Sequence, residues 1–331
     1  MVMKKILIIF SIIFLLSFSL VFAHVPFETG EGKNLETATV ITEPTKSWVV
    51  YEELHEEIQV KYYRLEMNQG ERIKLDLFAP VRSEFEPNII VTGPGIKSEE
   101  DLPEGIEVPE GAGFIILKSS LGEAEYEPFT PASYYYLSEA NIPVTETGTY
   151  YVGVFDFENE GKYGLAIGYV EKFSLSEWIG IPISVTRIRL WEGQSLVEVL
   201  APIILTVIFG LITFLLNKKT KNNLKSFSQI LIALAGLLYI GSGFSVIFQM
   251  AIAFTKASSS SASVTLIFAA IPIILGLIVL SYLNKNGQIK NTDRLFLLIL
   301  SLLGLVFWAG FIAGPMILAI SALGPSKKSK T

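Results

Sequence analysis

The feature that most constrains this chain is a set of four long apolar stretches in its C-terminal half. They lie at 199–216, 230–254, 264–283 and 295–323, and none has Asp, Glu, Lys, Arg or His in its interior. A helix needs about 20 apolar residues to cross a bilayer. We therefore predict an α-helical transmembrane bundle of four helices over 198–323, followed by a basic tail at 324–331. The lack of buried ionisable groups argues against ion-coupled transport.

The first 23 residues have the pattern of a signal peptide. Lys4 and Lys5 form a charged start, 6–16 is apolar, and Ala23 ends a candidate cleavage site. Such segments are removed on export. An uncleaved signal anchor is the alternative, and in both cases the segment that follows is expected outside the cell.

The charge of the chain divides between two regions. Residues 24–170 carry 27 Asp and Glu against 10 Lys and Arg, a net charge of −17, whereas 171–331 carries 5 acids and 14 bases. An acidic exported region repels nucleic acid and attracts cations, so we expect no nucleic-acid partner. The chain has no cysteine, which excludes disulfides and thiol chemistry.

Residues 24–170 have the short apolar alternation of β-strands. At 72–78 the side chains of Ile73, Leu75 and Leu77 fall on one face, as half-buried strands require. Further candidate strands, separated by glycine-containing or acidic turns, lie at 48–51, 60–67, 88–92, 114–118, 149–155 and 163–170. The fold class expected for 24–170 is an all-β, antiparallel, jelly-roll-like sandwich forming an extracytoplasmic domain.

Two pairs of these segments resemble a known family. Residues 61–67 with 70–77 resemble the opening hairpin of bacterial pre-peptidase C-terminal (PPC-like) domains, and 146–154 with 161–167 resemble their closing hairpin. That family is a small β-sandwich appended to secreted proteins. The resemblance covers about 45–170 and implies a binding or accessory role rather than catalysis.

The middle of this region departs from the family pattern. The insertion between about Gly95 and Asn141 is longer than the family expects, and 97–113 is rich in Pro and Glu, which favours a surface excursion. The whole chain also resembles a group of archaeal and bacterial membrane proteins, notably over 171–194, a resemblance that implies no particular activity.

Residues 171–197 are predicted to form interfacial linker helices. Ser174 and Glu177 have capping-box spacing, and Trp178 and Trp191 suit the headgroup level of a membrane. Pro182 is expected to break this segment. A linker helix lying on the sandwich is the alternative.

Four spans starting outside the cell give a mixed charge pattern. The loops at 217–229 and 284–294 carry lysines and would lie inside, as expected for cytoplasmic loops. Lys327, Lys328 and Lys330 in the tail would then lie outside, against the same rule. If the third stretch, 264–283, did not span, the tail would lie inside but Lys285, Lys290 and Arg294 would lie outside, and the charge count would tie. We expect four spans because 264–283 is apolar enough to insert on its own.

Only two histidines exist, His24 and His55. After cleavage at Ala23, the α-amine and imidazole of His24 could chelate copper(II), with His55 as a third nitrogen ligand. The alternative is that His24 begins a flexible terminus and His55 lies in a surface turn.

Residues 156–161 place acidic or amide oxygens at alternate positions before a glycine, like the first half of a calcium loop. The twelfth position is Ile167 rather than Glu, so an acidic hairpin turn is the alternative, with loosely bound calcium as a further expectation. No catalytic motif is present, and we expect no enzyme.

These inferences favour a multi-pass cell-membrane protein that acts as an extracytoplasmic binding or scaffold protein. Its expected partners are the lipid bilayer and, through the helices, another membrane protein of a complex. Exported copper handling through His24 and His55 is the alternative function.

Overall fold

A computed structural model describes residues 24–56, 58–83, 85–98, 100–217, 224, 226–257, 259–284 and 290–324. The predicted signal peptide lies outside these residues. The chain divides into two compact units. The first consists of Met1–Phe78, Phe85–Ser120 and Leu137–Phe173, and the second of Ala79–Glu84, Leu121–Tyr136 and Ser174–Thr331.

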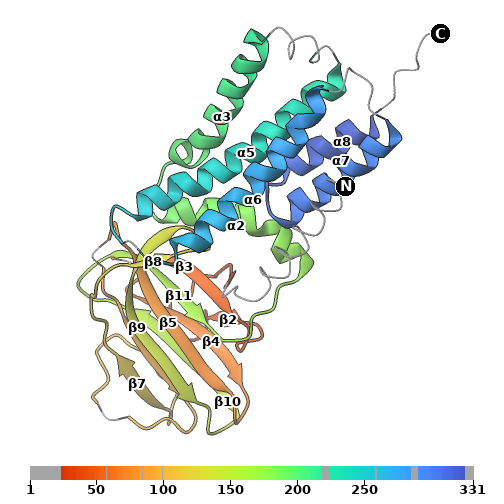
Figure 1. Ribbon diagram of the computed structural model, residues 1–331. Helices are drawn as coiled ribbons and strands as arrows, with labels where there is room; N and C mark the ends of the chain where they lie inside the picture. Colours follow the sequence, from red (N-terminus) through yellow and green to blue (C-terminus); the bar gives the residue numbers. More distant parts are fainter. Residues whose placement is uncertain are drawn as a thin grey trace, which may run out of the picture. The chain divides into compact units, whose positions relative to one another are not determined.

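Two mixed β-sheets account for the strands (Figure 1). One sheet has the order β1-β3-β11-β5-β9-β8 and the other β2-β4-β10-β6-β7. The strands are β1 Val25–Pro26, β2 Thr39–Ile41, β3 Trp48–Leu54, β4 Val60–Met67, β5 Arg72–Pro80, β6 Asn88–Gly93, β7 Gly113–Leu117, β8 Glu125–Glu127, β9 Ala132–Pro143, β10 Gly148–Phe155 and β11 Gly161–Ile167. Strands β5 and β9 begin in one unit and end in the other, and β8 lies within the second unit.

The two-sheet β fold is as the sequence predicts, but two details differ. The sandwich is not wholly antiparallel, because β1 pairs with β3 and β2 pairs with β4 in parallel. The two segment pairs read as hairpins are not hairpins either, since β4 and β10 lie in one sheet and β5 and β11 in the other. Each connection crosses between sheets, so β4 instead pairs with β10, and β5 with β11.

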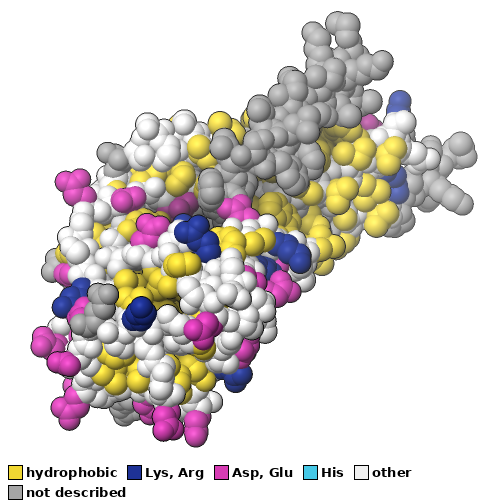
Figure 2. All heavy atoms as spheres, turned by 90° about the horizontal axis from the view of Figure 1, so that it is seen from below, with side chains coloured by type: hydrophobic (Ala, Val, Ile, Leu, Met, Phe, Trp, Pro, Cys, Tyr) yellow, Lys and Arg dark blue, Asp and Glu magenta, His cyan; other side chains and the backbone are white. Residues whose placement is uncertain are grey.

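The core of the first unit follows from the alternation along these strands. Ile73, Leu75 and Leu77 on β5 are almost fully buried. Two buried tyrosines join the sheets, with the Tyr63 and Tyr163 hydroxyls 2.7 Å apart. Burial raises the pKa of both phenols well above the usual range, so both stay neutral. On the face shown in Figure 2, Asp and Glu side chains are dispersed over the surface and do not form one patch.

The second unit is mainly helical. Its helices are α2 Leu175–Trp191, α3 Leu196–Leu216, α5 Phe227–Ala253, α6 Ala262–Ser281, the short 3-10 helix η1 Tyr282–Asn284, α7 Asn291–Val306 and α8 Ala313–Leu323. Three of them, α3, α5 and α6, are long and apolar enough to cross a membrane. Ser174 caps α2 through the predicted capping box with Glu177.

The fourth predicted span is not a single helix, because 295–323 forms two shorter helices. Helix α7 ends at Val306 and α8 begins at Ala313. Between them Trp308, Gly310 and Phe311 all have positive φ, a conformation that no α-helix contains. Gly310 and Gly314 therefore do not share a helical face, and both pack instead against the Tyr239 ring of α5.

Helices α7 and α8 form a hairpin that returns to the end where it began. Ser301 on α7 donates a hydrogen bond to the Pro315 carbonyl on α8 at 2.7 Å. At the far end of α8, the Ser321 hydroxyl lies 2.8 Å from that of Ser228, in the first turn of α5. The tail after Leu323 therefore starts at the same end of the helices as the start of α5.

Pro182 does not break α2, contrary to the prediction, and lies inside a continuous helix. A proline has no N–H, so the carbonyl four residues earlier loses its helical donor. That carbonyl belongs to Trp178, and it accepts a hydrogen bond from Trp308 Nε1 at 2.9 Å. Trp178 Nε1 in turn donates to the Val306 carbonyl at 3.2 Å. The proline thus leaves an acceptor that binds the turn between α7 and α8.

Small residues let α5 and α6 approach closely, as is common in membrane helices. A Cβ atom at Gly243 would lie 2.6 Å from the Ala269 carbonyl oxygen and 2.5 Å from the Ile273 side chain, whereas the space around Gly180 on α2 is open.

We expect Gly243→Ala to lower the free energy of unfolding by about 1–3 kcal/mol, the usual cost of overpacking a core. The matched variant Gly180→Ala should be neutral or stabilising by up to about 1 kcal/mol, from helix propensity alone. Unfolding of both purified variants in detergent tests this. Equal stability of the two would contradict the close α5–α6 contact.

Candidate functional site

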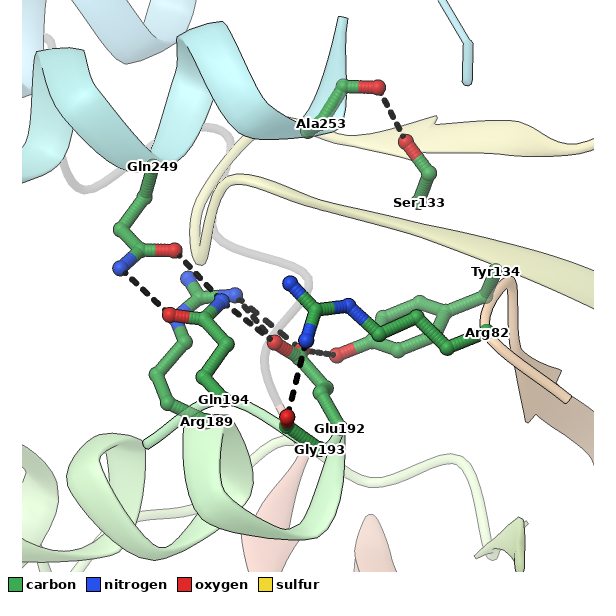
Figure 3. A network of polar contacts seen from close by, with 9 residues as sticks. All are labelled: Arg82, Ser133, Tyr134, Arg189, Glu192, Gly193, Gln194, Gln249 and Ala253. Carbon is green, nitrogen blue, oxygen red and sulfur yellow. Dashed lines mark hydrogen bonds and ion pairs between the residues drawn. The ribbon is translucent and has the colours of Figure 1, made fainter. Parts of the chain in front are cut away.

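In the described part of the second unit, charged and hydrogen-bonded side chains form a buried polar cluster at the C-terminal end of α5. Four segments supply it: Pro80–Arg82 after β5, the β8–β9 hairpin, the end of α2 with the residues after it, and the end of α5. The residues that these segments supply to the cluster all belong to the second unit, and Figure 3 shows nine residues of the cluster and its surroundings.

An ion pair forms the centre of the cluster. Arg189 Nη1 lies 2.9 Å from Glu192 Oε2, and the side chains are 3% and 10% exposed. One helical turn separates the two residues, so the end of α2 places them side by side. The Tyr134 hydroxyl donates a 2.5 Å hydrogen bond to Glu192 Oε1. Burial of this kind is tolerated when the charges are paired and hydrogen-bonded.

Arg189 also acts on the neighbouring strand β8. Burial raises the pKa of Glu127, while the Phe129 N–H and the Arg189 cation oppose that rise. Phe129 N donates to Glu127 Oε1 at 3.0 Å. The guanidinium thus lies in the field of two carboxylates from different elements.

Two buried amides connect the end of α2 to α5. Gln194 Nε2 donates to Gln249 Oε1 at 2.8 Å, and Gln249 Nε2 donates back to Gln194 Oε1 at 2.9 Å. Both side chains are buried. The reciprocal pair uses one donor and one acceptor of each amide, and it fixes the orientation of both side chains.

The β8–β9 hairpin is bound to the helix ends by side-chain hydrogen bonds. Ser133 Oγ donates to the Ala253 carbonyl at 2.9 Å. The Tyr126 hydroxyl lies 2.6 Å from Thr265 Oγ1, which donates to the Pro128 carbonyl at 2.6 Å. The hairpin therefore packs on both helices that border the α5–α6 connection.

A cavity of about 230 Å³ opens beside this cluster. Its charged lining residues are Arg82, Arg189, Lys256 and Glu192, an excess of two positive charges. Arg82 and Lys256 are exposed, whereas Arg189 and Glu192 are buried. Arg82 Nη1 donates to the Gly193 carbonyl at 2.8 Å, which fixes one side of the cavity (Figure 3). The cavity thus has an exposed cationic rim and a buried polar floor.

The structure places His24 at the start of the first unit. Its Nδ1 lies 2.6 Å from Ser47 Oγ, and β1 continues beside Trp48 and Val49 of β3. Much of the residue is exposed, yet desolvation of the ring and then the Lys74 cation lower the pKa of His24. A neutral imidazole is the form that binds a metal.

His55 lies beyond the other end of β3, in an isolated bridge with Ile58. Ser47, beside His24, is eight residues earlier, roughly 26 Å along an extended strand. The structure therefore does not bring the two histidines together, and one copper ion cannot be shared by both rings in this arrangement. Among the described residues no group of three or more His, Cys, Asp or Glu is arranged to hold a metal ion. Copper binding by His24 alone stays a prediction.

The 156–161 segment forms the turn between β10 and β11. Asp156 Oδ1 accepts hydrogen bonds from the backbone N–H groups of Glu158 and Asn159, both at 2.9 Å. The side chain thus stabilises the turn, as aspartate does in Asx-turns. Loosely bound calcium stays a prediction.

Part of this cluster is predicted from the sequence, and its centre is not. Gln249, Tyr239 and Ser242 are polar residues within an apolar stretch, a pattern that predicts bonds between helices. The Gln249 side chain does bond to Gln194, and the Tyr239 hydroxyl donates to the Leu300 carbonyl. Ser242 accepts from Gly310 N at 2.8 Å. Arg189 and Glu192 were missed, although two opposite charges three residues apart at a helix end are a usable signal.

No protein-family model matches the chain, and no curated protein matches it.

Proposed function

We propose that this protein is a membrane-anchored, extracytoplasmic binding or scaffold protein, accessory to a membrane complex. In this proposal the first unit contacts a ligand or partner outside the cell, and α3, α5 and α6 hold the chain in the bilayer. The apolar length of these helices supports the anchor, and the net negative charge of 24–170 together with the signal-like start supports export.

The observation that carries the proposal is the attachment of the β8–β9 hairpin to the helices. Ser133 and Tyr126 bind the hairpin to α5 and α6, and β9 continues from Tyr134 into the first unit. A simple anchored domain needs only a flexible linker. Here β9 is one strand whose residues belong to both units, which supports a role in which both units take part.

The α7–α8 hairpin supports an orientation in which the first unit is outside. The tail begins at the same end of the helices as α5, so its three lysines and the lysines that follow α3 and α6 in the sequence are expected on one side of the membrane. All three basic segments then fit the cytoplasmic side. This removes the conflict that four full spans created.

Helix α3 provides the surface for a partner in the membrane. Only Val199 and Ile203 of α3 are buried, while Phe209 is 64% exposed. In a bilayer, lipid can cover the exposed apolar face of α3. A helix of a second membrane subunit fits the same face.

Two experiments test the proposal. Protease added to intact cells should cleave within 24–170, and carbonate should not extract the protein; a protected β region or extraction would refute the anchored, exported placement. The intact protein should also elute from mild detergent with a second membrane protein in fixed ratio. Phe209→Ala should reduce that ratio, while Phe244→Ala, at an exposed site on α5, should not. Elution of the protein alone would refute the accessory role.

A further inference from the structure

The cavity at the end of α5 has the composition of an anion site. Three of its four charged lining residues are cationic, and the carboxylate of Glu192 is already paired with Arg189. That pairing leaves the exposed Arg82 and Lys256 as the excess charge, on the rim where a ligand enters. A guanidinium offers five N–H donors, of which Arg82 uses one on the Gly193 carbonyl. The site therefore favours an acceptor-rich, negatively charged group.

The surrounding acids do not cancel this excess inside the cavity. Besides Glu192, the carboxylates of Glu127 and Glu198 interact electrostatically with Arg189 and Arg82, respectively. Neither lines the cavity. Glu198 is exposed and accepts the Ser195 N–H in the cap of α3. Its carboxylate is therefore solvated and already hydrogen-bonded.

The volume and the position of the cavity narrow the choice of ligand further. About 230 Å³ greatly exceeds the roughly 10–15 Å³ that one water needs, and it is below the roughly 300–1,000 Å³ of drug-sized sites. The cavity lies where α5 ends at Ala253, and the end of a membrane-crossing helix is the depth of lipid headgroups. We propose that this cavity binds a phosphate group, either the phosphodiester of an anionic lipid headgroup or free phosphate.

This inference deepens the proposed function, because it rests on α5 crossing the bilayer and assigns a ligand to the segment that couples the hairpin to the helices. Arg82 would hold the phosphate oxygens through its free N–H donors, and Lys256 would contribute a point charge. Gln194 and Gln249 would form the floor in their fixed orientation.

The test is calorimetric titration of the purified full-length protein in uncharged detergent with two probes, short-chain phosphatidylglycerol and inorganic phosphate. Saturable binding of at least one probe is expected. Arg82→Gln and Lys256→Gln should each weaken it about tenfold, which corresponds to about 1.4 kcal/mol. Binding of phosphatidylglycerol alone identifies a lipid headgroup, and binding of phosphate alone identifies a free anion.

The control is Lys290→Gln, an exposed lysine at the start of α7, at the other end of the helices. This variant should leave the affinity for the bound probe unchanged, because binding depends on the cations of the cavity and not on the general positive charge of the protein. Equal weakening by this variant, unchanged affinity in both rim variants that unfold as the parent does, or no binding of either probe would overturn the proposal. Since the titration needs no cells, its failure would leave the protease result on orientation intact.

Discussion

Replacing Glu192 by Met is expected to lower the free energy of unfolding by about 3–5 kcal/mol, the usual cost of removing one partner of a buried ion pair. Arg189 is 3% exposed and would keep its charge without the carboxylate 2.9 Å away, because a guanidinium does not lose its proton in proteins. The Tyr134 hydroxyl would lose its acceptor as well. Denaturant titration of the purified protein in detergent measures the change.

The double variant Arg189→Met with Glu192→Met separates charge from packing. It should be more stable than Glu192→Met alone, since neither member of the ion pair is left as a buried charge without the other. Glu125→Gln on β8, an exposed carboxylate, is the matched control and should change stability by less than about 0.5 kcal/mol. A double variant less stable than the single one would show that the pair is not the source of the effect.

Single cysteines placed in this cysteine-free chain are expected to divide into two groups when intact cells are treated with a membrane-impermeant thiol reagent. Gly324→Cys, Ser226→Cys and Asn291→Cys should all be protected, because the α7–α8 hairpin returns to the end of the helices where α5 begins. Ser260→Cys, between α5 and α6, should be labelled. The expected contrast is nearly complete labelling against almost none.

Permeabilised cells supply the control for this pattern, since all four cysteines should react there. Labelling of Gly324→Cys in intact cells, with Ser226→Cys protected, would mean that 295–323 crosses the membrane once more and that the hairpin is wrong. Labelling of Ser226→Cys, Asn291→Cys and Gly324→Cys with protection of Ser260→Cys would keep the hairpin and reverse the orientation.

Local pattern predicted most of the individual strands, because alternation depends on neighbours in the sequence. The strand predicted at 60–67 is β4, and the one predicted at 72–78 is most of β5. Their pairing was wrong, because a short turn after Met67 can return a strand to its own sheet or carry it to the other one. Only the packing of the two faces decides between these, and β9 was missed because its twelve residues lack clear alternation.

The helices and the site were predicted incompletely from the sequence for a similar reason. Composition identified 295–323 as long enough to span, but composition does not show that Trp308 and Phe311 adopt positive φ. The proline rule predicted a break at Pro182, and the rule failed because Trp308, far along the chain, supplies the donor that the helix lacks. In the same way, the buried position of Glu192 depends in part on Tyr134, 58 residues earlier, whose hydroxyl donates to its carboxylate.

The two buried tyrosines of the first unit have a consequence for how the sheets assemble. Each hydroxyl finds its counterpart across the interior, between β4 and β11. Sliding β4 by one position in one direction would put Arg64, which is exposed, in the place of Tyr63, since successive side chains point to opposite faces. The Tyr163 hydroxyl would then lose Tyr63 as its partner, and a guanidinium would enter the apolar interior without a carboxylate, at a cost of at least about 1–3 kcal/mol. The tyrosine pair therefore favours the observed register of β4 in a chain that has no disulfide to fix it.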